Sequence, residues 1–180
     1  MPDDRRLIQQ LKRGDKEALR HIYQDYKDDL LTVAASLLHD ACAAEDVLHD
    51  VFVSFASGVG SLELRSSLRS YLMTSVVNRV RDRFRQKGSL VTGLDKVDAF
   101  SSENDGPEQR AVLTEQSRKL AQALAQLPLE QREVIVLHLN GGMKFREIGE
   151  LQGISPSTVQ GRYRYAIDKL RTILNGALRK

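Results

Sequence analysis

The segment FREIGELQGISPSTVQGRYR, residues 145–164, constrains the fold of this chain more strongly than any other stretch. Its apolar residues recur at every third or fourth position, as in a helix, but Gly149 and Gly153 interrupt the pattern and a Ser-Pro pair divides it. A glycine inside a helix costs about 1 kcal/mol relative to alanine. We therefore expect the geometry of this segment to require both glycines.

Two short helices that cross steeply around a tight turn would meet this requirement. Such a crossing needs a small residue on the first helix, which Gly149 provides. The turn needs a residue that tolerates positive φ, which Gly153 provides, while Ile148, Ile154 and Val159 supply a shared apolar contact. The pattern predicts a helix-turn-helix.

The second helix of this motif has the composition of a surface that reads DNA. Ser155 is a suitable N-cap, and Pro156 falls at the first helical position, where its missing N–H costs nothing. No acidic residue occurs from Ser155 to Ile167. Arginine can bind guanine, glutamine can bind adenine, and hydroxyls near a helix N-terminus can bind phosphate. The predicted contacts to duplex DNA are Ser155, Ser157, Thr158, Gln160, Gly161, Arg162 and Arg164.

The remaining sequence predicts an all-α protein of two small helical domains joined by a flexible linker. Residues 7–38 read as two helices separated at Gly14 and Asp15, and further helices are expected over 43–57 and 68–87. Residues 88–112 contain glycine, serine and acidic residues without sustained periodicity, which is typical of a linker. Four more helices follow, so the predicted domains are 1–87 and 113–180.

Charge is distributed unevenly within the first predicted domain. From Asp25 to Asp50 there are seven acidic residues and one basic residue, whereas from Arg65 to Lys87 there are seven basic residues and one acidic residue. A basic helix face attracts phosphate through counterion release, and an acidic face is better suited to a protein with a basic surface. The two surfaces are expected to bind different partners, unless both are ordinary solvated helix faces.

The composition disfavours several other classes of protein. No run approaches the roughly 20 apolar residues of a membrane span, and the charged N-terminus does not resemble a signal peptide, so a cytoplasmic location is expected. The single cysteine rules out an intramolecular disulfide. The four histidines form no metal-ligand spacing with one another or with the cysteine, and no phosphate-binding Gly-Lys-Ser/Thr loop occurs. We therefore expect no enzymatic activity, no metal and no cofactor.

Several segments, taken in order, resemble those of one protein family. They are LKRGDKEALRHIYQDY, AEDVLHDVFVSF, SYLMTSVVNRVRDRFR, and the C-terminal region that starts at LPLEQREV and contains the helix-turn-helix. Over nearly its full length the chain resembles the extracytoplasmic function (ECF) sigma factors, a small two-domain branch of the sigma-70 family of bacterial RNA polymerase sigma factors. Asn78, Asp82 and Arg85 also fall at the spacing usual in that family.

This resemblance implies a role in promoter-specific transcription initiation together with bacterial core RNA polymerase. The acidic helix would dock on the polymerase through Glu45, Asp46, His49 and Asp50. The following loop and basic helix would open the minus-ten promoter element and hold its single strand through Leu64, Arg65, Leu68, Arg69, Tyr71, Asn78, Arg79, Arg81, Asp82, Arg83 and Arg85. The helix-turn-helix would bind the minus-thirty-five element as duplex DNA. Members of the family are commonly held inactive by an anti-sigma factor, which this sequence does not identify.

A few positions depart from the family pattern. Leu64 and Leu68 stand where phenylalanine is common, and Tyr71 stands where tryptophan is common, so stacking on bases is expected to be weaker. In the recognition helix, Gln160 stands where lysine is frequent and Gly161 where serine is usual. Neither the helix crossing nor the turn explains Gly161, which sits on the face expected to read the promoter.

Two other classes of function stay open at this point. A conventional helix-turn-helix regulator would bind duplex DNA as a symmetric dimer, without polymerase, and would use its N-terminal helices for ligand sensing or dimerisation. A protein-interaction adaptor with incidental basic helices would show no salt-sensitive DNA binding.

Overall fold

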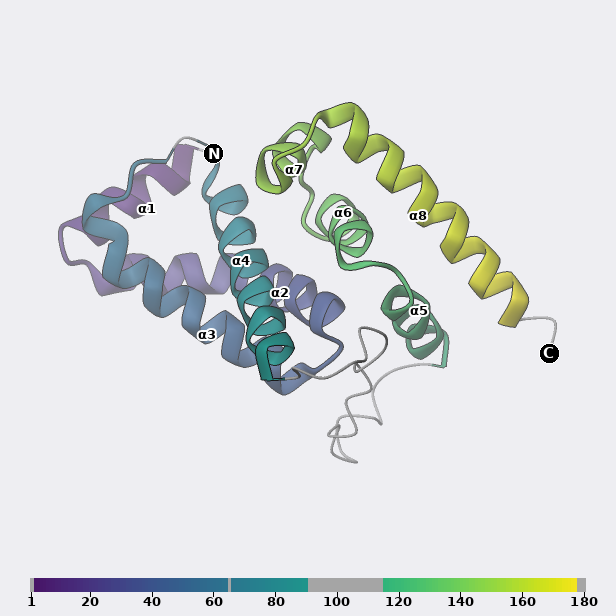
Figure 1. Cartoon of the computed structure of the whole chain (residues 1–180). Coiled ribbons are helices and arrows are strands. Elements are labelled where there is room, and N and C mark those ends of the chain that lie inside the picture. Colours follow the sequence, from purple (N-terminus) through teal and green to yellow (C-terminus); the bar gives the residue numbers. More distant parts are fainter. Residues whose placement is uncertain (1, 65, 91–114, 178–180) are drawn as a thin grey trace.

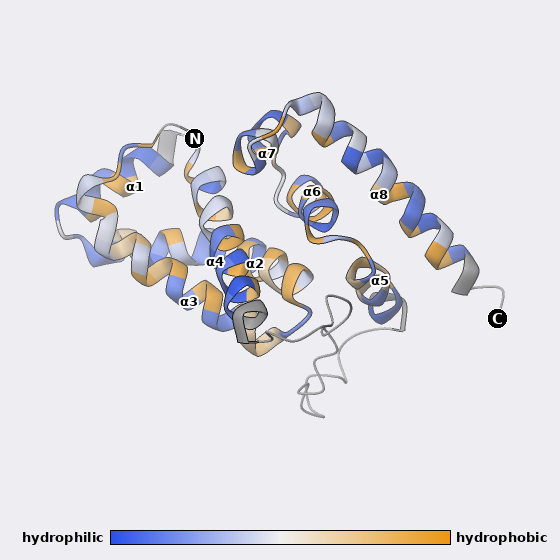
Figure 2. Ribbon diagram, viewed as in Figure 1, coloured by the Kyte–Doolittle hydropathy of each residue, from blue (hydrophilic) through white to orange (hydrophobic). Residues whose placement is uncertain are grey.

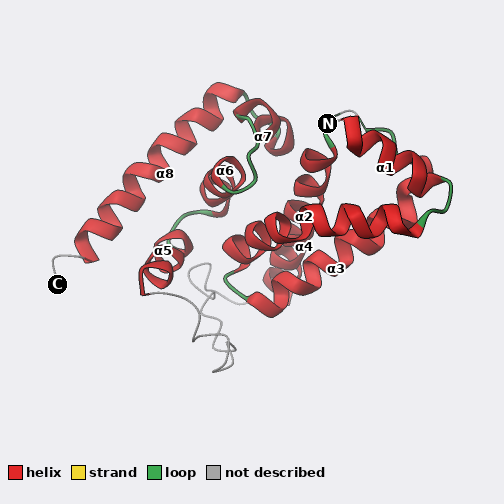
Figure 3. Cartoon of the chain, turned by 180° about the vertical axis from the view of Figure 1, so that it is seen from behind, coloured by secondary structure: helices red, strands yellow, loops and turns green. Residues whose placement is uncertain are grey.

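The computed structural model describes residues 2–64, 66–90 and 115–177. Within these ranges every regular element is helical (Figures 1 and 3), which confirms the all-α class. The elements are α1 (Pro2–Lys12), α2 (Lys16–Leu38), α3 (Ala41–Gly58), the short 3-10 helix η1 (Val59–Ser61), α4 (Leu68–Leu90), α5 (Glu115–Ala125), α6 (Leu129–Leu139), α7 (Phe145–Gln152) and α8 (Pro156–Ala177).

Short polar side chains define where the N-terminal helices begin. Asp15 accepts a hydrogen bond from the backbone N–H of Glu17 at 2.9 Å, directly after Gly14 with its φ of 89°. The predicted break between the first two helices is therefore confirmed. Asp40 caps α3 and Ser67 caps α4 in the same way, each through a side-chain oxygen that accepts a backbone N–H.

Helices α1 to α4 pack around a common apolar core. Apolar and polar residues alternate along these helices (Figure 2), and the buried apolar residues of all four helices belong to one cluster. The largest fully buried side chains include Ile22, Leu30, Val47, Phe55 and Leu72. This packing leaves the outer face of α3 and part of α4 exposed.

The two halves of the chain also pack against each other. Helix α2 contacts α6, and Val134, Leu137, Met143 and Ile148 belong to the same buried cluster as the core of the first four helices. A second, smaller cluster joins α5, α6 and α8. The division at 1–87 and 113–180 therefore stays a prediction, because one cluster spans both parts. Helix α4 runs to Leu90, and residues 91–112 of the predicted linker lie outside the described residues.

Arg132 is the most buried basic side chain at this junction, with 5% of its surface exposed. Its guanidinium donates to the carbonyl oxygen of Leu37 at the end of α2, at 2.9 Å, and to those of Leu124, Ala125 and Leu127 at the end of α5, at 2.9 to 3.1 Å. Carbonyls in the last turn of a helix lack intrahelical donors and carry partial negative charge. Arg132 thus caps two helices from different halves of the chain.

The predicted helix-turn-helix is formed by α7 and α8. Gly153 ends α7 in the left-handed region, with a φ of 68°. Ser155 Oγ accepts the N–H of Thr158 at 3.1 Å, and Pro156 is the first residue of α8. A Cβ on Gly149 would lie 2.7 Å from the carbonyl oxygen of Ile154, so the helices cross in contact there. The requirement for both glycines is confirmed.

Replacing Gly149 by alanine is expected to destabilise the protein by about 1 to 3 kcal/mol, because the new methyl group would press against the backbone of the turn. Thermal unfolding followed by circular dichroism would measure the loss. Gly58→Ala is the matched control, because a Cβ at Gly58 would meet nothing within 4 Å. A Gly149→Ala variant as stable as the wild type would contradict the close crossing.

Acidification is expected to destabilise the fold through His39. This residue ends α2 with a φ of 55°, and burial, together with the charge of Arg132, lowers the pKa of its imidazole to about 4. Because the unfolded pKa is near 6.5, the contribution is fully present above pH 6.5 and is lost as pH falls towards 4.

Urea unfolding between pH 7 and pH 4 would measure this contribution, which we expect to be roughly 1 to 3 kcal/mol. The variant His39→Asn is the control, since asparagine tolerates the left-handed conformation and does not titrate. Equal pH dependence in the wild type and the variant would refute the assignment to His39.

Candidate nucleic-acid interface

The outer face of α3 carries the four residues predicted to bind polymerase. Glu45, Asp46, His49 and Asp50 are all exposed, and they alternate along the helix with the buried Val47, Leu48 and Val51. An open hollow of about 500 Å³ lies beside this face, between α2 and α3. Its lining is largely apolar, with Tyr23, Leu48, Phe52 and Val53 among the contributors, and it also includes Glu45 and His49.

The basic face of α4 adjoins the acidic face of α3. Asn78 and Arg79 are exposed, and Arg79 donates to the hydroxyl of Ser54 on α3 at 2.7 Å. Arg83 forms an ion pair with Asp46 at 3.2 Å. The structure therefore brings the predicted polymerase surface and the predicted strand-binding surface together along one edge. Farther along α4, Arg85 pairs with Asp82.

The predicted strand-capturing side chains before and within early α4 lie at different depths. Leu64 and Tyr71 are partly buried, and the Tyr71 ring lies 6.1 Å from the Phe55 ring between centroids. Leu68 has no exposed surface, so its side chain belongs to the core and is not available for stacking on a base in this conformation. Arg65 lies outside the described residues.

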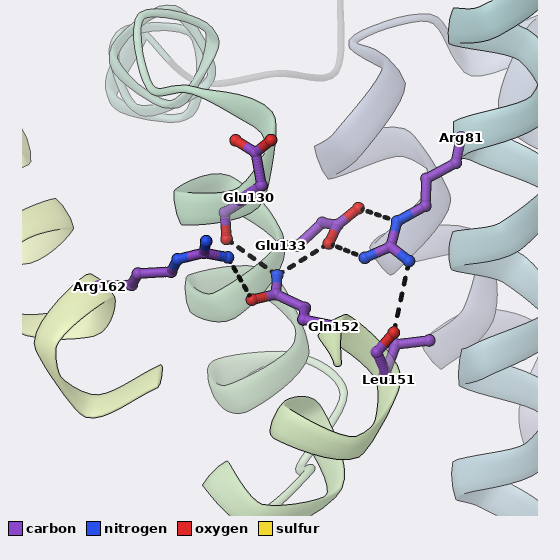
Figure 4. A network of polar contacts seen from close by, with 6 residues as sticks. All are labelled: Arg81, Glu130, Glu133, Leu151, Gln152 and Arg162. Atoms are coloured by element: carbon purple, nitrogen blue, oxygen red, sulfur yellow. Dashed lines mark hydrogen bonds and ion pairs between the residues drawn. The ribbon is translucent and has the colours of Figure 1, made fainter. Parts of the chain in front are cut away.

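Arg81, another residue predicted to contact the single strand, is bound within the protein (Figure 4). Its guanidinium donates to both carboxylate oxygens of Glu133 on α6, at 2.8 and 2.6 Å, and Glu133 is only 1% exposed. The hydrogen bonds to Glu133 are the main reason that the pKa of Arg81 is raised above its usual value. A bidentate pair of this kind is directional as well as strong.

The network continues from Glu133 to the helix-turn-helix (Figure 4). The side-chain amide of Gln152, at the end of α7, donates to Glu133 at 2.9 Å and to the carbonyl oxygen of Glu130 at 3.1 Å. Gln152 in turn accepts a hydrogen bond from Arg162 of α8 at 2.8 Å. Arg81 and Arg162, which were predicted to contact different parts of DNA, thus lie at the two ends of one polar chain.

A second polar contact joins the start of α4 to the α6–α7 turn. Arg69 donates to the carbonyl oxygen of Gly141 at 2.8 Å and pairs with Asp29 of α2 at 2.9 Å. Ser70 donates to the carboxylate of Glu147 on α7. Arg69, like Arg81, is therefore engaged inside the protein.

The first turns of α8 present the remaining predicted DNA contacts to solvent. Ser155, Ser157, Thr158, Gln160 and Arg164 are exposed, and the three hydroxyl groups lie together at the helix N-terminus, with 2.8 Å from Ser155 Oγ to each of the other two. Gly161 and Arg162 are partly exposed.

Sequence reasoning missed several residues of this region. Glu133 and Gln152 were not singled out, although the acidic side chain of Glu133 precedes the strongly apolar run VIVL, where an ionisable group calls for a partner. Tyr165, 63% exposed on α8, was also missed. Its position directly after Arg164, in a helix with a basic surface, could have indicated this aromatic side chain as a candidate DNA contact.

The described residues hold no group of three or more histidine, cysteine, aspartate or glutamate side chains arranged to bind a metal ion. In the same part of the chain, no helix has the length and apolar character needed to cross a membrane.

Comparison with known proteins shows the family to which the chain is similar. Residues 22–89 match sigma-70 region 2, and residues 117–170 match sigma-70 region 4. The chain is 28% identical over 176 residues to the ECF RNA polymerase sigma factor SigW of Bacillus subtilis, which covers 93% of this chain and 94% of that protein. It is also 28% identical over 172 residues to the RNA polymerase sigma factor CarQ of Myxococcus xanthus, covering 93% and 95% respectively.

Solved structures of similar proteins share the fold. CnrH in complex with the cytosolic domain of CnrY superposes with a TM-score of 0.71 at 25% identity, covering 96% of this chain and 97% of CnrH. The sigma factor RpoE of Bartonella quintana, in complex with the anti-sigma factor NepR, gives a TM-score of 0.69 at 26% identity, covering 87% and 98%. With both conserved regions matched and full-length relatives of one type, the chain belongs to the sigma-70 family of RNA polymerase sigma factors, as an ECF-type member.

Proposed function

We propose that this chain binds bacterial core RNA polymerase through α3, opens the minus-ten element with α4 and binds the minus-thirty-five element with α8. The observation that carries the proposal is the contiguity of the exposed acidic face of α3 with the basic face of α4, in a chain that also has a complete helix-turn-helix. One protein with these three surfaces can contact the polymerase and two DNA sites at once, so that the second DNA contact becomes intramolecular.

On the α3 face, the proposed polymerase contacts are Glu45, Asp46, His49 and Asp50. Three carboxylates exposed within six residues produce a local negative potential that suits a basic partner surface. On α4, the proposed strand contacts that the structure leaves exposed are Asn78, Arg79 and Arg85. Aligned cations and amides on such a helix favour a single-stranded phosphate backbone.

The proposal also covers catalysis, location in the cell and a regulatory partner. We expect the polymerase to carry out the chemistry, since sigma factors are initiation factors, and we expect the chain to act in the cytoplasm. An anti-sigma factor is a proposed partner, because two similar sigma factors were solved in complex with the cytosolic domain of CnrY and with the anti-sigma factor NepR. The dimeric regulator and the adaptor predict no polymerase-dependent initiation.

Reconstituted transcription tests the proposal. The full chain, mixed with bacterial core polymerase on a promoter library, is expected to produce specific transcript starts that core polymerase alone does not produce. Glu45→Gln with Asp50→Asn should weaken core binding roughly tenfold at low salt, and the difference should shrink as salt screens the charges. Asn78→Ala with Arg79→Ala should instead keep core binding and impair promoter opening.

The exposed Asp25→Asn is the matched control for the loss of acidic charge, because Asp25 lies outside the proposed contact face. Fluorescence anisotropy would report core binding, and permanganate reactivity of unpaired thymines would report opening. No initiation above core polymerase alone would reject the proposal, and loss of core binding in the α4 variant would show that the two interfaces are misplaced.

Arg81 is a less suitable probe of strand binding, because it also stabilises the fold through Glu133. In a double-mutant cycle of Arg81→Met and Glu133→Gln, urea unfolding should give a coupling energy of about 1 to 3 kcal/mol, since either single change leaves a buried group without its partner. The exposed pair Arg146–Glu150 is the control, with an expected coupling near zero. A coupling near zero for Arg81 and Glu133 as well would mean that this contact does not hold the two halves together.

A further inference from the structure

Gly161 has no structural reason to be glycine. It lies in the interior of the 22-residue helix α8, and its φ is not positive. A Cβ built on Gly161 would meet nothing within 4 Å, in contrast to Gly149, where a carbonyl oxygen blocks it. Glycine weakens a helix interior because it loses more conformational freedom on folding than any other residue. Packing within the described chain therefore does not require glycine at position 161, and the open side of this residue is its outer surface on α8.

The position of Gly161 on the helix indicates where that contact occurs. At 100° per residue, Gly161 points roughly opposite the buried stripe of Val159, Ala166 and Leu170. Thr158, one turn before, and Tyr165, one turn after, are both exposed on the same side. Because Gly161 has no side chain, the surface of α8 forms a depression between the side chains of Thr158 and Tyr165, and a ligand could contact the helix backbone there.

The charge of the first turns of α8 favours an anionic ligand at the same position. The helix carries no acid from its start to Ile167, whereas Asp168 is exposed on the next turn of the same side. Arg162 and Arg164 follow closely after Gly161 in the sequence. Because Asp168 forms an ion pair with Arg171, a polyanion would meet net positive charge along α8, including the turns around Gly161.

The surface at Gly161 is apolar. Its Cα hydrogens offer no strong donor or acceptor, and the backbone N–H and C=O groups of a helix interior are already bonded along the helix. In the major groove of duplex DNA, the group that lacks hydrogen-bonding capacity is the C5-methyl of thymine. The methyl group of a thymine projects into the groove, and it would fit the space that Gly161 leaves open because glycine has no side chain.

We propose that Gly161 determines sequence specificity by receiving the C5-methyl group of a thymine between Thr158 and Tyr165. The inference rests on the proposed binding of duplex DNA by α8. Any side chain at position 161 would occupy the space of that methyl group and hold the helix away from the base pair.

The test uses the full chain bound to core polymerase. A duplex covering the upstream promoter element is first selected from a randomised library, and each thymine in it is then replaced singly by deoxyuracil, which removes only the C5-methyl. For the wild type, one replacement should weaken binding roughly fivefold or more. Gly161→Ala should bind the selected duplex about tenfold more weakly, should respond little to that replacement, and should unfold a few °C higher.

Gly58→Ala is the matched control, because it also adds a methyl group in open space at a helical glycine, on α3. It should leave binding and thymine preference unchanged. The inference is overturned if Gly161→Ala keeps the affinity and preference of the wild type, or if no deoxyuracil replacement distinguishes the two proteins. If the wild type selects no sequence in this library, the proposed duplex binding by α8 itself fails.

Discussion

The ion pair between Arg81 and the buried carboxylate of Glu133 sets the arrangement of this protein. A carboxylate with 1% exposure must have a partner, because an isolated charge in the interior would cost several kcal/mol. Arg81 supplies two hydrogen bonds from α4, and Gln152 supplies a third from α7. Glu133 on α6 therefore joins α4 to the C-terminal helices (Figure 4), beside the shared apolar cluster and the contact of Arg132 with Leu37.

This arrangement uses residues that a DNA-binding protein would also need at its surface. Arg69 and Arg81 bond to groups of the opposite half of the chain, and Arg162 bonds to Gln152 at the end of the same network. A polar interface differs from an apolar one because its hydrogen bonds can be replaced by hydrogen bonds to water or to phosphate. The guanidinium groups at this junction are the ones for which protein and nucleic acid would compete.

Local features of the fold could be predicted because short-range physics decides them. The positive φ of Gly14 ends one helix, and the side chain of Asp15 caps the start of the next. The steric requirements at Gly149 and Gly153 likewise involve residues only a few positions away. The exposed acidic face of α3 follows from a period of 3.6 residues. In contrast, the depth of Leu68 and the pairing of Arg83 with Asp46 depend on how α3 and α4 pack, and no spacing along the chain reveals this.

The helices, their breaks, the helix-turn-helix and the acidic or basic character of each helix face could be predicted from the amino-acid sequence alone. Each of these depends on backbone sterics or on a periodicity within about ten residues. Which basic side chains bond within the protein became clear from the packing of the helices, because Arg81 contacts Glu133 across 52 residues and Arg132 contacts Leu37 across 95. It also separated the glycines: crossing and turn account for Gly149 and Gly153, whereas open space around Gly161 assigns that residue to the outer surface. Contacts between distant residues depend on packing, and packing exists only once the whole chain is folded.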